Sequence, residues 1–274
     1  MRSRLRIAPG LSLILRNAGI PPIGWDASKP VQEKSVLPEP FFSSEFSSFL
    51  EKPSFPSENF SPENISLENI SLEKPVDSSE KKVNILVLVS GNGTNLHALL
   101  SAGQRDALGG GRVTAVAADR PCYGLERARS AGIPGYLASD SDGILRTALK
   151  EQAECIVLAG FLPILSGKLL EAYAGRMINL HPSLLPKFGG KGMYGIKVHR
   201  AVLSAGEAES GCTVHFVTAG VDRGPILLQR RVPVLPGDDP ETLADRVRRE
   251  EHIAVTEGSA LLCRLCRSGS ARPV

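Results

Sequence analysis

The sequence has few aromatic residues, little net charge and no long apolar run. Aromatic residues make up 5% of its 274 residues, and the net charge is +3 at pH 7. That charge is too small to indicate a nucleic-acid partner. No segment approaches the run of about 18 apolar residues that a membrane-spanning helix needs. We therefore expect no nucleic-acid and no membrane partner, whereas 42% hydrophobic residues are enough for a globular core.

Cysteine is also scarce, and its placement indicates neither disulfides nor a metal. The five cysteines are an odd number and widely spread, which indicates reduced thiols in a reducing compartment. Cys263 and Cys266 form one CxxC pair, but no second pair or nearby His completes a zinc set. We expect no metal and interpret this pair as ordinary helix residues. Four histidines without metal-ligand spacing are expected to be structural: His97, His199, His215 and His252.

The first 82 residues lack the apolar faces of a packed domain. They hold 10 of the 20 prolines and six of the nine phenylalanines, and from Glu63 the unit ENISL occurs twice, a period that suits neither helix nor strand. Such a composition does not offset the entropy lost on folding. We predict a low-complexity, largely disordered extension over 1–82, one domain over 83–267 and a short tail over 268–274.

The beginning of the chain leaves two cellular locations open. Four Arg and no acidic residue precede Asp26, as in an organellar transit peptide, but the segment lacks a Ser-rich, strongly amphipathic pattern. A wrongly assigned upstream start codon would give the same pattern. We expect a cytoplasmic protein, with an organelle as the alternative if the segment is a transit peptide.

From Val83 onward the pattern becomes that of an α/β protein. Continuous β-branched apolar runs, typical of strands buried on both faces, alternate with helix-like stretches. Strands are expected at 83–90, 112–119 and 154–160, and helices at 94–103 and 123–133. This alternation predicts parallel strands with helices on the faces of the sheet. The runs CTVHFV and ILLQRRVPV are too close for a crossover, so they should pair antiparallel and make the sheet mixed.

One apolar run, in the segment MINLHPSLLP, ends on two polar residues. Asn179 and His181 are two apart, so their side chains share one face of a strand. Pro182 and Pro186 prevent a continuing central strand. From these residues alone, side chains satisfied by nearby backbone remain an alternative to a shared site.

The loop SGNGTNL joins the first predicted strand to the first helix. Its glycines allow backbone N–H groups to point outward at the helix N-terminus, where the dipole favours an anion. No GKS or GKT follows, and Leu96 stands where a dinucleotide fingerprint has its third Gly. The pattern favours a monophosphate site, with a tight strand-to-helix turn as the alternative.

The last predicted helix has a charge on its apolar face. Glu251 shares this face with five residues at spacings of three and four: Leu243, Val247, Val255, Gly258 and Leu262. An inward carboxylate needs a partner, and a pair of sugar hydroxyls would serve.

Six motifs in order give these residues a family resemblance. They are ILVLVSGNGTNL, YGLERARSAGI, VLAGFLPILS, INLHPSLLPKF, GCTVHFVTAGVDRGPIL and REEH. Together, from Val83 to Leu265, they resemble the glycinamide ribonucleotide formyltransferases, folate-dependent enzymes of purine synthesis. The resemblance implies a Rossmann-like formyltransferase fold that transfers the formyl group of 10-formyltetrahydrofolate to the amine of 5'-phosphoribosylglycinamide. We expect a monomer or a weak homodimer.

The resemblance also implies roles for individual residues. Asn179 and His181 match the Asn-x-His pair of the family's active site, and Asp222 matches its catalytic Asp. Glu251 matches a residue that binds the substrate ribose. The loop that holds the substrate phosphate corresponds to Gly93, Thr94 and Asn95. The folate pocket corresponds to Asn179 and two segments, which are Leu162, Pro163, Ile164 and Leu165, and Thr218, Ala219, Gly220, Val221 and Asp222.

The reaction explains why these residue types are needed. Attack of an amine on the formyl carbon creates an oxyanion, to which Asn179 can donate an N–H worth about 3 kcal/mol in comparable sites. A protonated His181 stabilises the same oxyanion and serves the proton transfers. We expect the adjacent Asp222 to favour the imidazolium and so to raise the pKa of His181. Taken alone, Asp222 favours the interpretation as a turn residue before Arg223 and Gly224.

The sequence departs from the family around the folate pocket. Pro163 stands where many members have an Arg, so a side-chain contact with folate is lost there. The family's folate-contacting Arg earlier in the chain has no clear counterpart around SDSDGILR, where Arg146 is the candidate. The loop FGGKGMYGIKVH is longer than in the shortest members and has four glycines from Gly189 to Gly195, so we expect it to move.

Three other functions share part of this pattern. A formyltetrahydrofolate hydrolase would need an N-terminal regulatory domain, which residues 1–82 do not resemble. A methionyl-tRNA formyltransferase would need a C-terminal RNA-binding domain, yet only seven residues follow Arg267. A non-catalytic nucleotide-binding module would not need Asn179, His181 and Asp222 together. The phosphate loop favours the nucleotide substrate over the hydrolase and the methionyl-tRNA formyltransferase, whereas a nucleotide-binding module would keep this loop and is disfavoured by the presence of all three residues.

Overall fold

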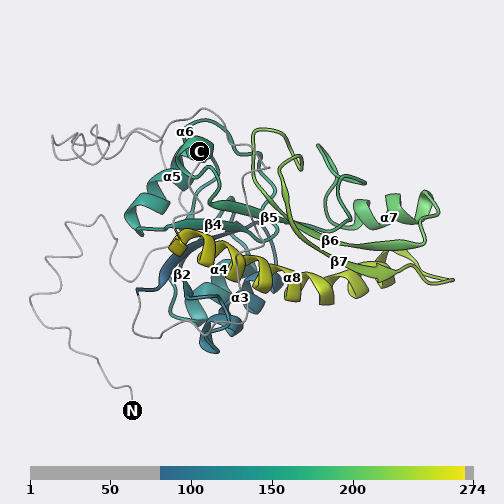
Figure 1. Cartoon of the computed structure of the whole chain (residues 1–274), viewed down its shortest axis with the longest axis horizontal. Coiled ribbons are helices and arrows are strands. Elements are labelled where there is room, and N and C mark those ends of the chain that lie inside the picture. Colours follow the sequence, from purple (N-terminus) through teal and green to yellow (C-terminus); the bar gives the residue numbers. More distant parts are fainter. Residues whose placement is uncertain (1–80, 269–274) are drawn as a thin grey trace, which may run out of the picture. The chain divides into compact units, whose positions relative to one another are not determined.

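The computed structural model describes residues 81–268, so the predictions for residues 1–80 and 269–274 lie outside the described part. Strands and helices alternate along this part of the chain (Figure 1). The strands are β1 Val83–Val89, β2 Gly111–Ala118, β3 Gly135–Leu137, β4 Cys155–Leu158, β5 Met177–His181, β6 Glu209–Phe216 and β7 Ile226–Pro233. The helices are α3 Thr94–Gln104, α4 Tyr123–Ser130, α5 Ser141–Lys150, α6 Lys168–Ala172, α7 Ile196–Ser204 and α8 Pro240–Ser268.

The strands form one seven-stranded sheet in the order β3-β2-β1-β4-β5-β6-β7. Pairing is parallel from β3 to β5, whereas β6 is antiparallel to both β5 and β7. The predicted mixed, mostly parallel sheet and its antiparallel last pair are therefore confirmed. The chain order reverses between β1 and β4, and in such sheets ligands bind in the crevice beyond the carboxyl ends of the strands.

Apolar layers cover both faces of the sheet because its inner strands have apolar side chains on both sides. All seven residues of β1 are buried. Ile85, Val87 and Val89 pack in one core with residues of α3, α4 and α8, whereas Leu86 and Leu88 pack in another with residues of α5 and α6. Figure 1 shows α8, in yellow, extending along the first of these faces.

Helix α8 buries the face that its sequence predicted. The five apolar-face residues are all buried: Leu243, Val247, Val255, Gly258 and Leu262. Gly258 lies so close to β6 that a Cβ there would be 2.8 Å from Val214 Cγ1. The helix therefore lies against the sheet directly, which fixes the depth at which Glu251 enters the molecule.

Four elements, β3, α5, α6 and α7, were not predicted from the sequence. β3 has three residues and α6 has five, which is too short for a recognisable periodicity. The signal for α5 was present, since Asp140 caps this helix by accepting the Gly143 N–H at 2.7 Å. All five cysteines are free thiols. Within residues 81–268 no helix is long and apolar enough to cross a membrane, and no group of side chains could hold a metal ion.

Candidate active site

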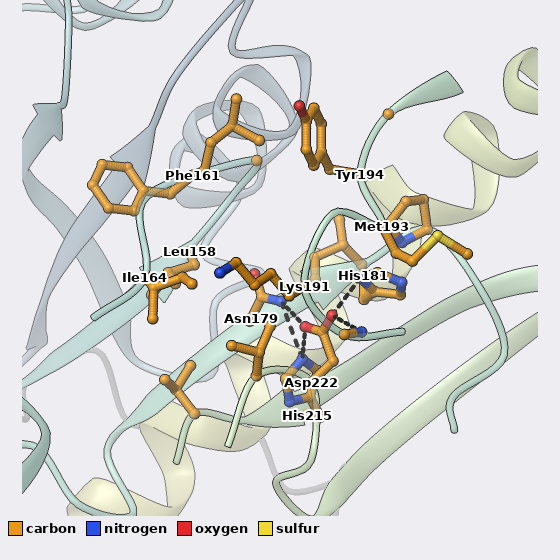
Figure 2. Close-up of a pocket in the computed structure, with 18 of the residues that line it drawn as sticks. Leu158, Phe161, Ile164, Asn179, His181, Lys191, Met193, Tyr194, His215 and Asp222 are labelled. Atoms are coloured by element: carbon orange, nitrogen blue, oxygen red, sulfur yellow. Dashed lines mark hydrogen bonds and ion pairs between the residues drawn. The ribbon is translucent and has the colours of Figure 1, made fainter. Parts of the chain in front are cut away.

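A pocket of about 610 Å³ opens beyond the carboxyl ends of β4 and β5 (Figure 2). Residues 160–165, 190–196 and 217–222 line it, and α8 contributes Arg248 and Glu251. These segments are far apart in sequence. Residues 160–165 and 190–196 follow the parallel strands β4 and β5, which end at the same edge of the sheet, the position expected for a ligand crevice. Residues 217–222 follow the antiparallel strand β6, and Asp222 contacts Asn179 and His181 from there.

Asn179, on β5, is oriented by its neighbour on β6. It pairs with His215 across the antiparallel β5–β6 ladder. The His215 Nδ1–H donates to the Phe216 carbonyl at 2.9 Å, so His215 Nε2 accepts from Asn179 Nδ2 at 3.1 Å. The second N–H of Asn179 is 3.5 Å from Asp222 Oδ1, a long contact. One amide N–H is thus fixed and the other faces the pocket near a carboxylate.

His181, the last residue of β5, is held from both sides. Its Nε2–H donates to the Phe188 carbonyl at 2.9 Å, because a carbonyl can only accept. Its Nδ1 lies 3.4 Å from Asp222 Oδ2. Figure 2 shows Asp222 between His181, Asn179 and His215, with dashed lines joining them. The two residues that the sequence placed on one strand face therefore do converge on a common carboxylate.

Asp222 lies in a turn with unusual backbone geometry. Its φ is 54°, a left-handed conformation that few residues other than Gly, Asn and Asp adopt. Its Oδ2 accepts the Gly190 N–H at 2.9 Å, which attaches the glycine-rich loop to the site. The backbone packs closely next to this contact, since a Cβ at Gly189 would be 2.5 Å from Leu185 Cδ2 and 3.2 Å from Asp222 Cβ, so a larger residue there would displace the Leu185 side chain. Burial disfavours the charged carboxylate, but its contacts with His215, His181 and Gly190 outweigh this and lower the pKa of Asp222.

The prediction that the pKa of His181 is raised is wrong. Burial disfavours the imidazolium, and this effect is larger than the opposing attractions of Asp222 and the Phe188 carbonyl. The pKa of His181 is therefore lowered rather than raised. Asp222 does act in the direction that the sequence indicated, but the side chain of His181 is only 5% exposed and loses most of its hydration. At neutral pH the imidazole is neutral, with its proton on Nε2.

The loop between β1 and α3 has the geometry of an anion site. Gly93 precedes α3 with φ 65°, and a Cβ there would be 2.8 Å from Gly124 Cα, so both the conformation and the close approach require glycine. Arg127 Nε donates to the Asn92 carbonyl at 2.8 Å and supports the loop from outside. No acidic residue occupies the first turn of α3, so its N-terminal N–H groups face no negative charge of their own helix.

Asn95 and Glu251 come together across α3 and α8. Asn95 Nδ2 donates to Glu251 Oε2 at 3.2 Å, and both residues line the pocket. Burial raises the pKa of Glu251, against the opposing hydrogen bond from Asn95. Asn95 Oδ1 is buried without a hydrogen-bond partner within the described residues. Gly93 and Thr94, also predicted to bind substrate, adjoin Asn95 but are not among the residues that line the pocket.

Both predicted folate segments line the pocket over their whole length, residues 162–165 and 218–222. Leu162 and Ile164 remain 46% and 59% exposed, so their side chains present an apolar surface. Arg146, the candidate for a folate contact, lies on α5 and is not among the lining residues.

Four basic residues of the pocket were not predicted as site residues from the sequence. His215 was expected to be structural, and only its register opposite Asn179 reveals that it holds the amide. His199 lies in the pocket wall, where burial lowers its pKa to about 4. Arg248 lies three residues before Glu251, so helical spacing could have placed it on the same side. Lys191 lies in the glycine-rich loop, where no periodicity predicts a direction.

Residues 83–258 match the formyl transferase family. The chain is 41% identical over 180 residues to phosphoribosylglycinamide formyltransferase of Escherichia coli (strain K12), covering 62% of this chain and 82% of that protein. It is 42% identical over 207 residues to the trifunctional purine biosynthetic protein adenosine-3 of Drosophila pseudoobscura pseudoobscura, covering 72% of this chain but 14% of that longer protein. The crystal structure of glycinamide ribonucleotide transformylase 1 from Symbiobacterium toebii superposes with a TM-score of 0.62 at 38% identity, over 73% of this chain and 94% of that one.

Proposed function

The chain belongs to the phosphoribosylglycinamide formyltransferase family, and we propose that its pocket transfers the formyl group of 10-formyltetrahydrofolate to the amine of 5'-phosphoribosylglycinamide. The family uses a folate-type co-substrate. The product of this step serves purine biosynthesis. Asn179, His181 and Asp222 carry the chemistry in this proposal.

One observation carries the proposal. Asn95 from the first turn of α3, the group formed by Asn179, His181 and Asp222, and an apolar wall line a single crevice. A phosphorylated amine can reach from α3 to Asn179, while a flat pteridine packs on Leu162 and Ile164. The carboxylate of Glu251 and the unpartnered Oδ1 of Asn95 lie between, where two acceptors suit sugar hydroxyls.

Asn179 stabilises the oxyanion in this mechanism. Its N–H toward His215 fixes the amide plane, and its other N–H has only the 3.5 Å contact with Asp222. That donor is therefore available when negative charge develops on the formyl oxygen. Because the amide is already oriented, little reorganisation is needed as the charge appears.

His181 moves the proton. As the amine nitrogen bonds to the formyl carbon, it gives a proton to Nδ1 of the neutral imidazole. The resulting imidazolium lies between the ionised Asp222 and the Phe188 carbonyl, which both stabilise positive charge. The imidazolium then protonates the departing folate nitrogen as its bond to carbon breaks, and His181 returns to the neutral form.

The decisive assay supplies 10-formyltetrahydrofolate to the purified protein with and without 5'-phosphoribosylglycinamide. We expect loss of the formyl group only when the nucleotide is present, with one formylated nucleotide made per tetrahydrofolate released. Equal loss in both reactions would identify a hydrolase instead. Formylation of methionyl-tRNA but not of the nucleotide would assign the acceptor to RNA.

A further inference from the structure

The pocket holds few positive charges for a site that receives two anionic molecules. Of the residues that line it, only Lys191 and Arg248 are Lys or Arg. The proposed nucleotide carries a phosphate, and the folate carries two carboxylates on its glutamate tail. The two cations lie on different elements, α8 and the glycine-rich loop, so they can serve different ends of the pocket.

Arg248 belongs to the nucleotide end. It lies one helical turn before Glu251, and it pairs with Asp245 on the same helix. Its charge also acts on Glu251, His199 and His252, all of them on the α7–α8 side of the pocket or next to it. Arg248 therefore acts on the groups of the nucleotide end of the pocket.

Lys191 has a different setting. It is exposed, and within residues 81–268 it has no hydrogen-bond or ion-pair partner. Its neighbour Gly190 donates to Asp222, which holds the backbone of this part of the loop at the site. Figure 2 shows the Lys191 side chain crossing in front of Asn179 toward Ile164. An uncompensated ammonium thus faces the apolar wall across the pocket.

The apolar wall itself offers no cation. Pro163 and its neighbours are uncharged, and in residues 217–222 the one charged side chain is Asp222, which is negative. Arg146 does not line the pocket. Among the residues that line the pocket, a ligand that packs its ring on this wall therefore finds a cation for its carboxylates in Lys191 or Arg248 and not in the wall itself.

We propose that Lys191 is the residue that recognises the glutamate carboxylates of the folate co-substrate. This proposal rests on the proposed function. In it, Lys191 determines the specificity of the pocket for a folate with an acidic tail. The ammonium forms an exposed ion pair with a carboxylate once the ring is in place. It takes no part in bond making, so it affects co-substrate affinity and leaves kcat unchanged.

The expected effect is modest because the pair is solvent-exposed and Lys loses side-chain freedom when it binds. Exposed ion pairs of this kind change binding by about two- to fivefold. Because dissolved salt screens exposed charges, the contribution should fall as ionic strength rises from about 0.01 M to 1 M.

The test uses tetrahydrofolate and a neutral analogue in which both glutamate carboxylates are amides. Calorimetric titration gives the Kd of each for the wild type, Lys191→Gln and Lys191→Arg. Lys168→Gln is the matched control, since Lys168 is an exposed lysine just beyond the apolar wall that does not line the pocket. We expect Lys191→Gln to weaken the diacid about two- to fivefold and the diamide not at all, and we expect Lys191→Arg to bind as wild type.

Two results would overturn the role of Lys191. In the first, Lys191→Gln weakens the diacid and the diamide equally, which indicates a structural effect of the loop. In the second, no affinity changes while kcat falls, which assigns Lys191 to the chemistry. The proposed function fails separately, if wild-type protein binds tetrahydrofolate but does not formylate the nucleotide.

Discussion

The substitution Asp222→Asn tests the proton-transfer step most directly, because it removes a charge and preserves the shape. Asn tolerates the left-handed backbone that Asp222 adopts at φ 54°. Its Oδ1 can still accept the Gly190 N–H, so the glycine-rich loop keeps its attachment. A change in activity therefore reports the loss of the carboxylate charge.

The magnitude follows from the geometry. Asp222 Oδ2 lies 3.4 Å from His181 Nδ1. At an effective dielectric constant of about 20, a full ion pair at that distance is worth about 5 kcal/mol, which is an upper bound for stabilisation of the imidazolium. General acid–base catalysis contributes about 10²- to 10⁴-fold. We expect Asp222→Asn to lower the plateau kcat at least about a hundredfold.

The direction in which kcat depends on pH follows from the role of His181. His181 accepts a proton only when neutral, so kcat rises with pH through the pKa of this residue. Burial already lowers that pKa, and Asp222 partly opposes the effect. Without the carboxylate the pKa falls further, so the acidic limb of the kcat profile moves to lower pH while its plateau drops.

The measurements are kcat from pH 4 to 9 and NMR titration of the His181 ring in both proteins. An acidic limb that stays in place or moves to higher pH would refute the coupling between Asp222 and His181. A plateau kcat of Asp222→Asn within about twofold of the wild-type value would also refute it, because the ion pair would then contribute almost nothing to catalysis.

Three further substitutions test other parts of the site. His181→Ala should lower kcat about 10²- to 10⁴-fold at every pH, and adding Asp222→Asn should cost little more; additive losses would show that the two act independently. Glu251→Gln should raise the nucleotide KM about ten- to hundredfold and leave the folate KM unchanged, whereas unfolding would mark Glu251 as structural. His199 has a folded pKa of about 4 against about 6.5 unfolded, so folding stability falls as pH drops through this window. Denaturant titrations should show that His199→Gln removes up to about 3 kcal/mol of this loss; an unchanged pH dependence would contradict the assignment.

The sequence by itself determined that the sheet is mixed and mostly parallel, and which polar residues lie at the end of one of its strands. Continuous apolar runs such as Val83–Val89 predict strands buried on both faces, and the spacing of apolar residues along α8 predicts that Glu251 points inward. Strand alternation put Asn179 and His181 on one face. These are local properties, fixed by period and by the order of elements along the chain.

Only the tertiary structure decided the hydrogen-bond partners, the protonation and the positions of the site residues. The partner of Asn179 is His215, which lies on another strand and is selected by ladder register. The direction in which the pKa of His181 is shifted depends on how far the packed loops exclude water from its side chain. The residue pattern along the chain does not predict the extent of this burial. Lys191 has the same dependence, since a loop of glycines carries no period and only its attachment to Asp222 brings the ammonium into the pocket. Burial, register and loop position arise from contacts between segments that are distant in sequence, so the tertiary structure alone determines them.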